Sequence, residues 1–246
     1  MSRLQAFLRA TAAGGSEMVV SAPFTAYFEP STALRFRNYA IPDDVAEPDV
    51  AAVGRLRSVF RQRERLPRLE WLEEAAPLVA PALAAAGMEQ ELRAPLMACT
   101  PAELLTVTPE LDRLTVAPVG DGDLRDSVEV QRAAFGDEPT PPDEPPRDIR
   151  KRGGGAVLAR VDGDPVAAAA WTPVIDVTSE IVGVATAEAW RRRGLAGAVT
   201  AAAARAAFAA GASLCVLSPG DETAQRVYER AGFRRVATML HWSDPD

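Results

Sequence analysis

Three consecutive arginines followed by a glycine, at residues 191–194, are the part of this 246-residue chain best suited to bind an anion. They lie between an apolar run of β type, 181–185, and an alanine-rich run, 196–210, that predicts a helix. The first amides of a helix have no partner within it and point beyond its N-terminus. A glycine beside them lets the backbone approach a phosphate without a Cβ in the way. The segment therefore predicts a phosphate site, although an exposed basic turn would have the same composition.

A second chemical signature follows that helix. An apolar strand is predicted over 214–218, and a turn containing the helix-capping residue Asp221 comes next. A short helix is predicted over 223–231, and Gly232 is the residue type that commonly ends one. Within this helix stands Tyr228, whose hydroxyl can donate a hydrogen bond or a proton.

Together these two segments resemble the two hallmarks of the GCN5-related N-acetyltransferase family. Residues 191–196 are similar to its Arg-x-x-Gly-x-Ala loop, which holds the pyrophosphate of acetyl-CoA, and residues 224–233 to its Ala-x-x-x-Tyr-x-x-x-Gly-Phe segment. They occur in the family's order, and the resemblance covers roughly residues 113 to 242. The resemblance implies an α/β fold with a mixed sheet, the acyl-CoA N-acyltransferase fold. It also implies acetyl-CoA as a cosubstrate.

Site residues follow from the same resemblance. Tyr228 would be the general acid for the departing CoA thiolate, or would only pack against the CoA arm. A tyrosine pKa of about 10 exceeds a thiol pKa of about 8.5, so this proton donation is uphill unless the site adjusts it. Glu180 begins the strand that carries the base in several family members. A backbone amide near Val184 or Ala185 would polarise the thioester carbonyl. The residues expected to bind acetyl-CoA are Val184, Ala185, Thr186, Arg191, Arg192, Arg193, Gly194, Leu195, Ala196 and Asp221, the last standing where the family often has asparagine.

The expected function is direct transfer of an acetyl group from acetyl-CoA to the amine of a small molecule or an aminoacyl group. A CoA-binding sensor or scaffold without efficient transfer is the alternative, and a longer acyl group is a further one. The sequence does not name the acceptor, because one cofactor site serves many acceptors on the same fold.

Composition limits the other possibilities. A net charge of −7 argues against nucleic acid as the main partner, and an apolar fraction of 48% is ample for a core. Two cysteines, Cys99 and Cys215, and a single histidine predict neither a disulfide framework nor a metal cluster. No run approaches the roughly 18 apolar residues that span a bilayer, and no leader segment is evident. We therefore expect a cytoplasmic protein with no membrane partner, and the alanine-rich, lysine-poor composition suggests a bacterial source.

The second part of the chain, 113–246, has the pattern of one complete unit. A strand and a helix are predicted over 114–119 and 124–135, and the proline-rich acidic segment 138–147 predicts a loop. That loop could gather a cationic amine, or its carboxylates could simply be solvated. Strands are predicted over 155–161, 166–174 and 180–185, with a hairpin turn at 162–164. This order matches the family's mixed sheet.

The residue pattern of the first part, 1–112, indicates a degenerate copy of the same fold. An unrelated accessory domain is the alternative. The segment 86–88, where an alanine-rich helix ends at glycine, and the strand predicted over 89–99 resemble 231–233 and the strand after it. In that alignment Leu83 replaces Tyr228, and the carboxylates of Glu47 and Asp49 stand where a phosphate would bind. We therefore expect acetyl-CoA to bind the second half alone.

Two further expectations concern the first half and its connection. Residues 100–112 would link the halves. The arginines between 55 and 68 would form the solvated face of a helix, with RNA or another anionic partner as the alternative. Two halves in one chain could imitate a dimer, so we expect a monomer or a homodimer.

Overall fold

The computed structural model describes residues 2–30 and 32–245 and divides into two compact units. The first unit comprises Met1–Leu96 with Val236–Asp246, and the second comprises Met97–Arg235. Segment 100–112 therefore belongs to the second unit, and most of the last strand belongs to the first. Among the described residues, no helix is long and apolar enough to cross a bilayer.

The second unit is a mixed sheet whose elements follow the expected order, which confirms the predicted fold class. Its sheet runs β6-β7-β8-β9-β10, and the end of β5 lies on the far side of β10. Among the described strands of this unit, only β9 and β10 run parallel to each other. The strands are β6 (Leu114–Pro118), β7 (Gly155–Val161), β8 (Asp164–Trp171), β9 (Thr178–Thr186), β10 (Leu214–Leu217) and β5 (Glu89–Cys99). The helices are α4 (Leu124–Phe135), α5 (Leu195–Ala209) and α6 (Glu222–Arg230), with short 3-10 turns η2 (Asp121–Asp123), η3 (Ile149–Arg152) and η4 (Glu188–Trp190).

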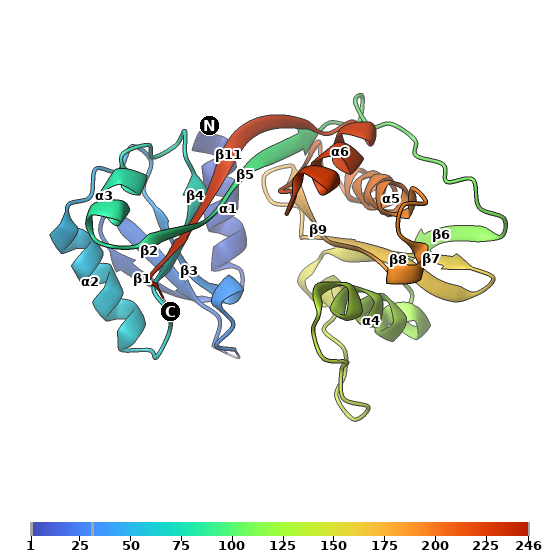
Figure 1. Ribbon diagram of the computed structural model, residues 1–246, viewed down its shortest axis with the longest axis horizontal. Coiled ribbons are helices and arrows are strands. Elements are labelled where there is room, and N and C mark those ends of the chain that lie inside the picture. Colours follow the sequence, from blue (N-terminus) through green and yellow to red (C-terminus); the bar gives the residue numbers. More distant parts are fainter. Residues whose placement is uncertain (1, 31, 246) are drawn as a thin grey trace. The chain divides into compact units, whose positions relative to one another are not determined.

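Helices cover both faces of this sheet. The figure shows α4 on one side of β8 and β9, and α5 with α6 on the other (Figure 1). Side chains that alternate along β8 accordingly separate into two cores: Ala168 and Ala170 pack with Val130 of α4, whereas Ala167 and Ala169 pack with Val199 of α5. The β7–β8 hairpin turns at Asp162 and Gly163, whose φ values of 53° and 92° match the turn type that two-residue hairpins prefer.

Apart from β6, which has no counterpart among the described residues, the first unit repeats this order of elements. Three antiparallel strands, β1 (Glu17–Ser21), β2 (Phe24–Phe28) and β3 (Asn38–Pro42), follow helix α1 (Ser2–Ala13), and η1 (Arg35–Arg37) precedes β3. Helix α2 (Val50–Arg61) connects β3 to the parallel strand β4 (Arg68–Leu72), as α5 connects β9 to β10. Helix α3 (Val79–Ala85) then leads to β5, as α6 leads to β11 (Arg234–Ser243).

The last strand of each half completes the sheet of the other unit. β11 pairs antiparallel with β4, with Met239 opposite Leu72 and Ser243 opposite Arg68. The end of β5 pairs antiparallel with β10, with Met97 opposite Leu217. A self-contained pair of copies would instead place β11 beside β10 and β5 beside β4. The sheet of each unit therefore depends on a strand from the other half of the sequence.

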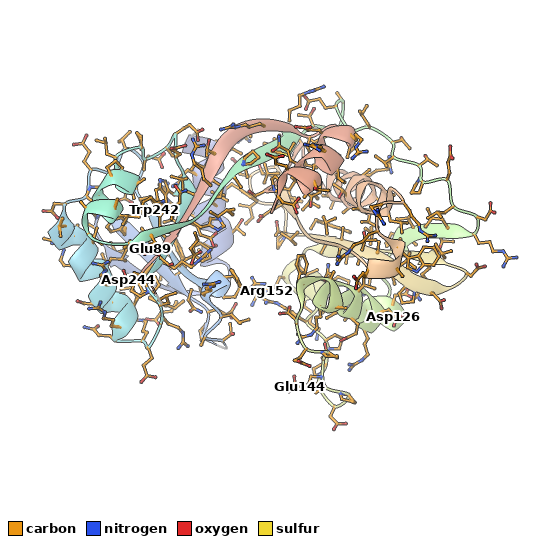
Figure 2. The ribbon with its side chains drawn as sticks, in the orientation of Figure 1. Glu89, Asp126, Glu144, Arg152, Trp242 and Asp244 are labelled. Carbon is orange, nitrogen blue, oxygen red and sulfur yellow. The ribbon has the colours of Figure 1, made fainter. Side chains whose placement is uncertain are left out.

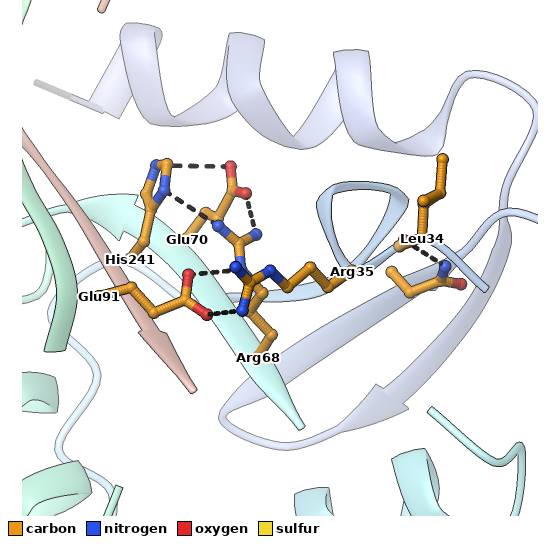
Figure 3. A network of polar contacts seen from close by, with 7 residues as sticks. Leu34, Arg35, Arg68, Glu70, Glu91 and His241 are labelled. Atoms are coloured by element: carbon orange, nitrogen blue, oxygen red, sulfur yellow. Dashed lines mark hydrogen bonds and ion pairs between the residues drawn. The ribbon is translucent and has the colours of Figure 1, made fainter. Parts of the chain in front are cut away.

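The prediction of a solvated helix face is wrong for one arginine of the segment between 55 and 68. Arg68 is 1% exposed on β4, where it forms ion pairs with Glu70 and with Glu91 of β5 at 2.8 Å (Figure 3). It also donates to Nδ1 of His241 on β11 at 3.0 Å. Burial lowers the pKa of His241, so the ring accepts this bond in its neutral form. The partners of Arg68 are distant in sequence, which is why the local charge pattern did not reveal its burial.

Candidate active site

The segment between β9 and α5 forms a concave array of backbone amides. Arg192 and Gly194 have positive φ values of 64° and 81°, on either side of Arg193, before α5 begins at Leu195. Such alternation turns successive N–H groups toward one point and creates an anion-binding concavity. The first bond into the helix runs from the Ala198 amide to the Gly194 carbonyl at 3.1 Å. Within the described residues, the amides of 192–197 have no acceptor, so they remain available to a ligand.

The three arginines of this loop keep their positive charge uncompensated. All three are exposed, and none forms an ion pair with a carboxylate in the described part of the chain. Arg191 donates to the Thr186 carbonyl at 3.4 Å, and the guanidinium of Arg193 lies 4.8 Å from the centre of the Trp190 ring. These contacts hold the side chains near the loop without neutralising them, as an anion site requires.

Strand β9 contains one extra residue opposite β8. Ala170 lies opposite Val182 and Ala168 opposite Ala185, so two steps along β8 match three along β9. Gly183, with φ of 60°, occupies the irregular position. Val182 packs in the core with α4 and Val184 in the core with α5, so the inserted residue reverses the alternation of the strand. A bulge of this kind re-aims the backbone groups that follow it.

Beyond Glu180, one edge of β9 has no strand beside it in the described chain. β10 pairs with Thr178, Ser179 and Glu180 only, whereas β9 continues to Thr186. The Thr186 hydroxyl is buried and has no hydrogen-bond partner among the described residues. An extended polar chain could pair with this edge, and it would end at the amides of 192–197. The donors present therefore fit a ligand with an amide-containing arm and a phosphate group.

Tyr228 lies on α6, on the face of the sheet that carries α5. It is 9% exposed and packs in the same core as Ile181 and Phe233. Burial, with the charge of Asp221 as a smaller cause, raises its pKa to about 12. Its hydroxyl makes no hydrogen bond to any residue that the structure describes. The group is therefore a protonated donor without an internal acceptor.

Asp221 caps α6, since its Oδ1 accepts from the Ala224 amide at 2.7 Å. This use of the carboxylate places it at the start of the helix that carries Tyr228. Whether Asp221 also contacts a ligand stays a prediction.

Glu180 lies on the opposite face of β9 from Tyr228. Side chains alternate along a strand, and its neighbour Ile181 belongs to the core that contains Tyr228. Val216, which is the β10 partner of Glu180, marks the last paired position before the two strands part. The two predicted catalytic side chains thus lie on different sides of the sheet.

Segment 100–112 packs against the loop and α6, which the sequence did not reveal. The Leu105 amide donates to the Ala231 carbonyl at 3.1 Å, and a Cβ on Gly232 would lie 2.1 Å from the Glu103 carbonyl oxygen. A Cβ on Gly197 would lie 3.0 Å from Val107. Gly197, a second glycine in the first turn of α5, was the signal in the sequence that another segment packs closely there.

The proline-rich segment after α4 is held by main-chain contacts. Arg125 of α4 donates to the carbonyls of Thr140, Pro142 and Glu144, and Glu129 accepts from the Thr140 amide at 3.1 Å. Figure 2 labels Glu144 in this segment, below α4. The carboxylates of the segment are exposed. The arginine therefore organises the backbone of the segment and leaves its negative charges to solvent.

The corresponding positions of the first unit lack this chemistry. Asp49 caps α2, since its Oδ1 accepts from the Ala52 amide at 2.7 Å. Its carboxylate thus occupies a helix N-terminus that would otherwise face an anion. Leu83 is fully buried at the position expected to match Tyr228. In the described residues of either unit, no group of three or more histidine, cysteine or acidic side chains could hold a metal ion.

Comparison with known proteins gives a consistent family. The model of the acetyltransferase (GNAT) family matches residues 124–233. A GCN5-related N-acetyltransferase from Kribbella flavida is 33% identical, with a TM-score of 0.83 and coverage of 100% of this chain and 95% of that one. No curated protein matches the chain.

More distant structures share the fold alone. A GCN5-related N-acetyltransferase from Sphaerobacter thermophilus is 17% identical, with a TM-score of 0.65 and coverage of 90% of this chain and 76% of that one. A tandem GNAT protein from the clavulanic acid biosynthesis pathway is 11% identical, with a TM-score of 0.61 and coverage of 91% and 79%.

Proposed function

The chain belongs to the GCN5-related N-acetyltransferase family, and from this premise we propose that its second unit transfers an acetyl group from acetyl-CoA to an amine nitrogen. The observation that carries the proposal is the set of unpartnered amides at 192–197, beside uncompensated arginines and the open edge of β9. The acceptor is a small amine or an aminoacyl group.

The loop binds the pyrophosphate of acetyl-CoA through the backbone of 191–196. Hydrogen bonds to a charged group contribute about 1.5–3 kcal/mol each, and the helix dipole adds about 0.3–1 kcal/mol. Several convergent amides therefore matter more than the dipole, and Arg191, Arg192 and Arg193 raise the local concentration of the anion.

The pantetheine arm pairs with β9 at its open edge. The Ala187 amide bonds to Val166 of β8, so by alternation the Thr186 amide points to the opposite edge. The Val184 amide, which follows the bulge, polarises the thioester carbonyl. We assign this role to Val184 rather than Ala185. The side chain of Ala185 packs in the α4 core, and its backbone pairs with Ala168 of β8.

Transfer then requires one bond to form and one to break. The amine nitrogen attacks the thioester carbon, the C–N bond forms, and the C–S bond breaks as the nitrogen loses a proton and the sulfur gains one. With a pKa of about 12, Tyr228 remains protonated at neutral pH. Full proton donation to a thiolate of pKa about 8.5 is uphill by roughly 5 kcal/mol, so Tyr228 stabilises the leaving sulfur chiefly as a hydrogen-bond donor.

Glu180 acts from the other face of the sheet. The two strands part just beyond it, so an amine that enters from the α4 side meets acetyl-CoA, bound on the α5 side, through the gap. In this arrangement Glu180 takes the proton of the amine directly or through a water molecule. If no acceptor amine reaches the gap between β9 and β10, the site binds acetyl-CoA without transfer, which is the alternative function of a CoA-binding sensor.

A turnover assay separates these two functions. The full-length protein is incubated with acetyl-CoA and a panel of small amines and aminoacyl amides, and the released thiol is measured. Release that depends on the amine, with the acetyl group recovered on nitrogen, supports the enzyme. Tight binding of acetyl-CoA with no amine-dependent release across the panel supports the sensor.

The first unit completes this proposal as a degenerate copy that binds no acetyl-CoA. The shared order of elements supports common descent, and the Asp49 cap explains the lost phosphate site. Two such units in one chain make a monomer sufficient for activity, and a homodimer stays the alternative.

A further inference from the structure

A side chain from α4 fixes the bulge in β9. Gln131 donates from Nε2 to the carbonyl of Gly183 at 2.8 Å. A Cβ added to Gly183 would lie 2.5 Å from the same Nε2 atom, so the amide group of Gln131 covers this residue. The φ of 60° favours glycine here, and a Cβ would displace the amide group of Gln131 from its present position.

The bond determines the direction of a second group. The carbonyl of Gly183 and the N–H of Val184 belong to one planar trans peptide unit, in which they point in opposite directions. Because Gln131 draws the carbonyl toward α4, the Val184 N–H points away from α4. That direction leads to the face of the sheet that carries α5, α6 and Tyr228.

We propose that Gln131 is a positioning residue, which holds the Gly183–Val184 peptide so that the Val184 amide donates to the thioester carbonyl of acetyl-CoA. The inference rests on the proposed function of the same site. Without Gln131, the peptide at a bulge has no other side-chain partner among the described residues and can rotate. Preorganised donors are effective because they need no reorientation during the reaction.

The test uses the full-length protein and acetyl-CoA carrying ¹³C at the thioester carbonyl. The infrared stretching frequency of this carbonyl falls when its oxygen accepts a hydrogen bond, and the signal needs no acceptor amine. The variants are Gln131→Met, which removes the donor at similar size, and Gln131→Glu, which donates only when protonated. Gln5→Met is the matched control, since Gln5 is a buried glutamine of the first unit that bonds the Leu72 amide at 3.0 Å.

We expect bound acetyl-CoA to show a lowered frequency in the wild type and in Gln5→Met, and a frequency near the free value in Gln131→Met. The kcat of Gln131→Met should fall by about tenfold or more, with the Kd for acetyl-CoA changed less than about threefold. Gln131→Glu should regain the lowered frequency and its kcat as the pH falls into the range where its carboxyl is protonated. A side chain that only supported the fold would give no such recovery.

Several results would overturn the inference. A Gln131→Met protein with the wild-type frequency and kcat would do so, and so would a wild type whose bound acetyl-CoA keeps the free frequency. A Gln5→Met protein that loses the shift equally would show that general destabilisation is the cause. In these cases acetyl-CoA still binds and the proposed function stands. Failure of the wild type to bind acetyl-CoA would instead remove the proposed function and the inference together.

Discussion

Cys99 and Cys215 lie directly opposite each other on the antiparallel strands β5 and β10, although they come from different halves of the sequence. Both thiols are free and buried, and burial raises the pKa of Cys99 to about 11 and that of Cys215 to about 12. The two thiols therefore stay protonated and pack as small apolar side chains. They lie where β5, from the first half of the sequence, pairs with β10 of the second unit.

This arrangement makes a prediction about a chain divided between residues 112 and 113. The fragment 113–246 lacks β5, so the edge of β10 and the packing surface of Gly232 would be exposed. We expect this fragment alone to show no cooperative unfolding transition by circular dichroism. Co-expressed with 1–112, it should co-purify as a complex with the far-ultraviolet spectrum of the intact chain. A monomeric 113–246 with a sharp thermal transition would contradict the exchanged strands.

The role of Tyr228 predicts a specific kinetic change. Tyr228→Phe removes the donor to the leaving sulfur and keeps the ring, so kcat should fall by about tenfold or more with little change in KM for acetyl-CoA. A wild-type kcat in this variant would leave the tyrosine with a packing role only.

The raised pKa of Tyr228 makes a separate prediction about pH. A donor must be protonated, and the hydroxyl remains so until the pH approaches its pKa of about 12. The kcat of the wild type should therefore show no loss from tyrosine ionisation between about pH 8 and pH 10, where an ordinary tyrosine begins to titrate. A decline in that interval that is absent from Tyr228→Phe would contradict the raised pKa.

The buried ion-pair network of Arg68 predicts a large effect on stability. Arg68→Met leaves Glu70 and Glu91 without their shared cation, and breaking a buried pair costs about 3–5 kcal/mol. The carboxylates retain some solvent contact, which moves the expected loss of unfolding free energy to the lower end of that range. The control Arg93→Met breaks an exposed pair with Glu73 and should cost about 0–1 kcal/mol. Equal losses in urea unfolding would contradict the distinction.

The bounds of several helices and strands could be predicted from the sequence, where the local residue pattern alone defines them. The bounds expected for α4, β5 and β7 are those observed, because apolar periodicity and flanking glycines define them locally. The bulge at Gly183 was not predicted, since all residues of 181–185 are apolar or glycine and no alternation exists to be interrupted. The strand exchange was also missed, because β5 and β11 follow the same helix-glycine pattern and nothing local specifies which strand each one joins.

Prediction of the candidate site from the sequence was also limited to residues marked by a local pattern. The loop 191–196 and Tyr228 could be found because spacing alone marks them. The contacts of Gln131 and Val107 with this site depend on partners far away in sequence, as does the burial of Arg68 in the first unit. Their side chains gave no signal that distinguishes them from ordinary helix, linker or surface residues.

Binding of acetyl-CoA by the loop before α5 is tested by calorimetric titration. Acetyl-CoA is titrated into the wild type, into the double variant Arg191→Ala with Arg193→Ala, and into the control Arg205→Ala. Arg205 is an exposed residue further along α5, so its substitution removes one positive charge away from the loop. Gly194→Glu is a harsher variant, because its φ of 81° would strain any other residue.

We expect micromolar binding to the wild type and to Arg205→Ala. Binding should be weakened about tenfold or more in the double variant and lost in Gly194→Glu. Absence of binding to the wild type, or equal affinity in all four proteins, would contradict the assignment of this loop as the acetyl-CoA site.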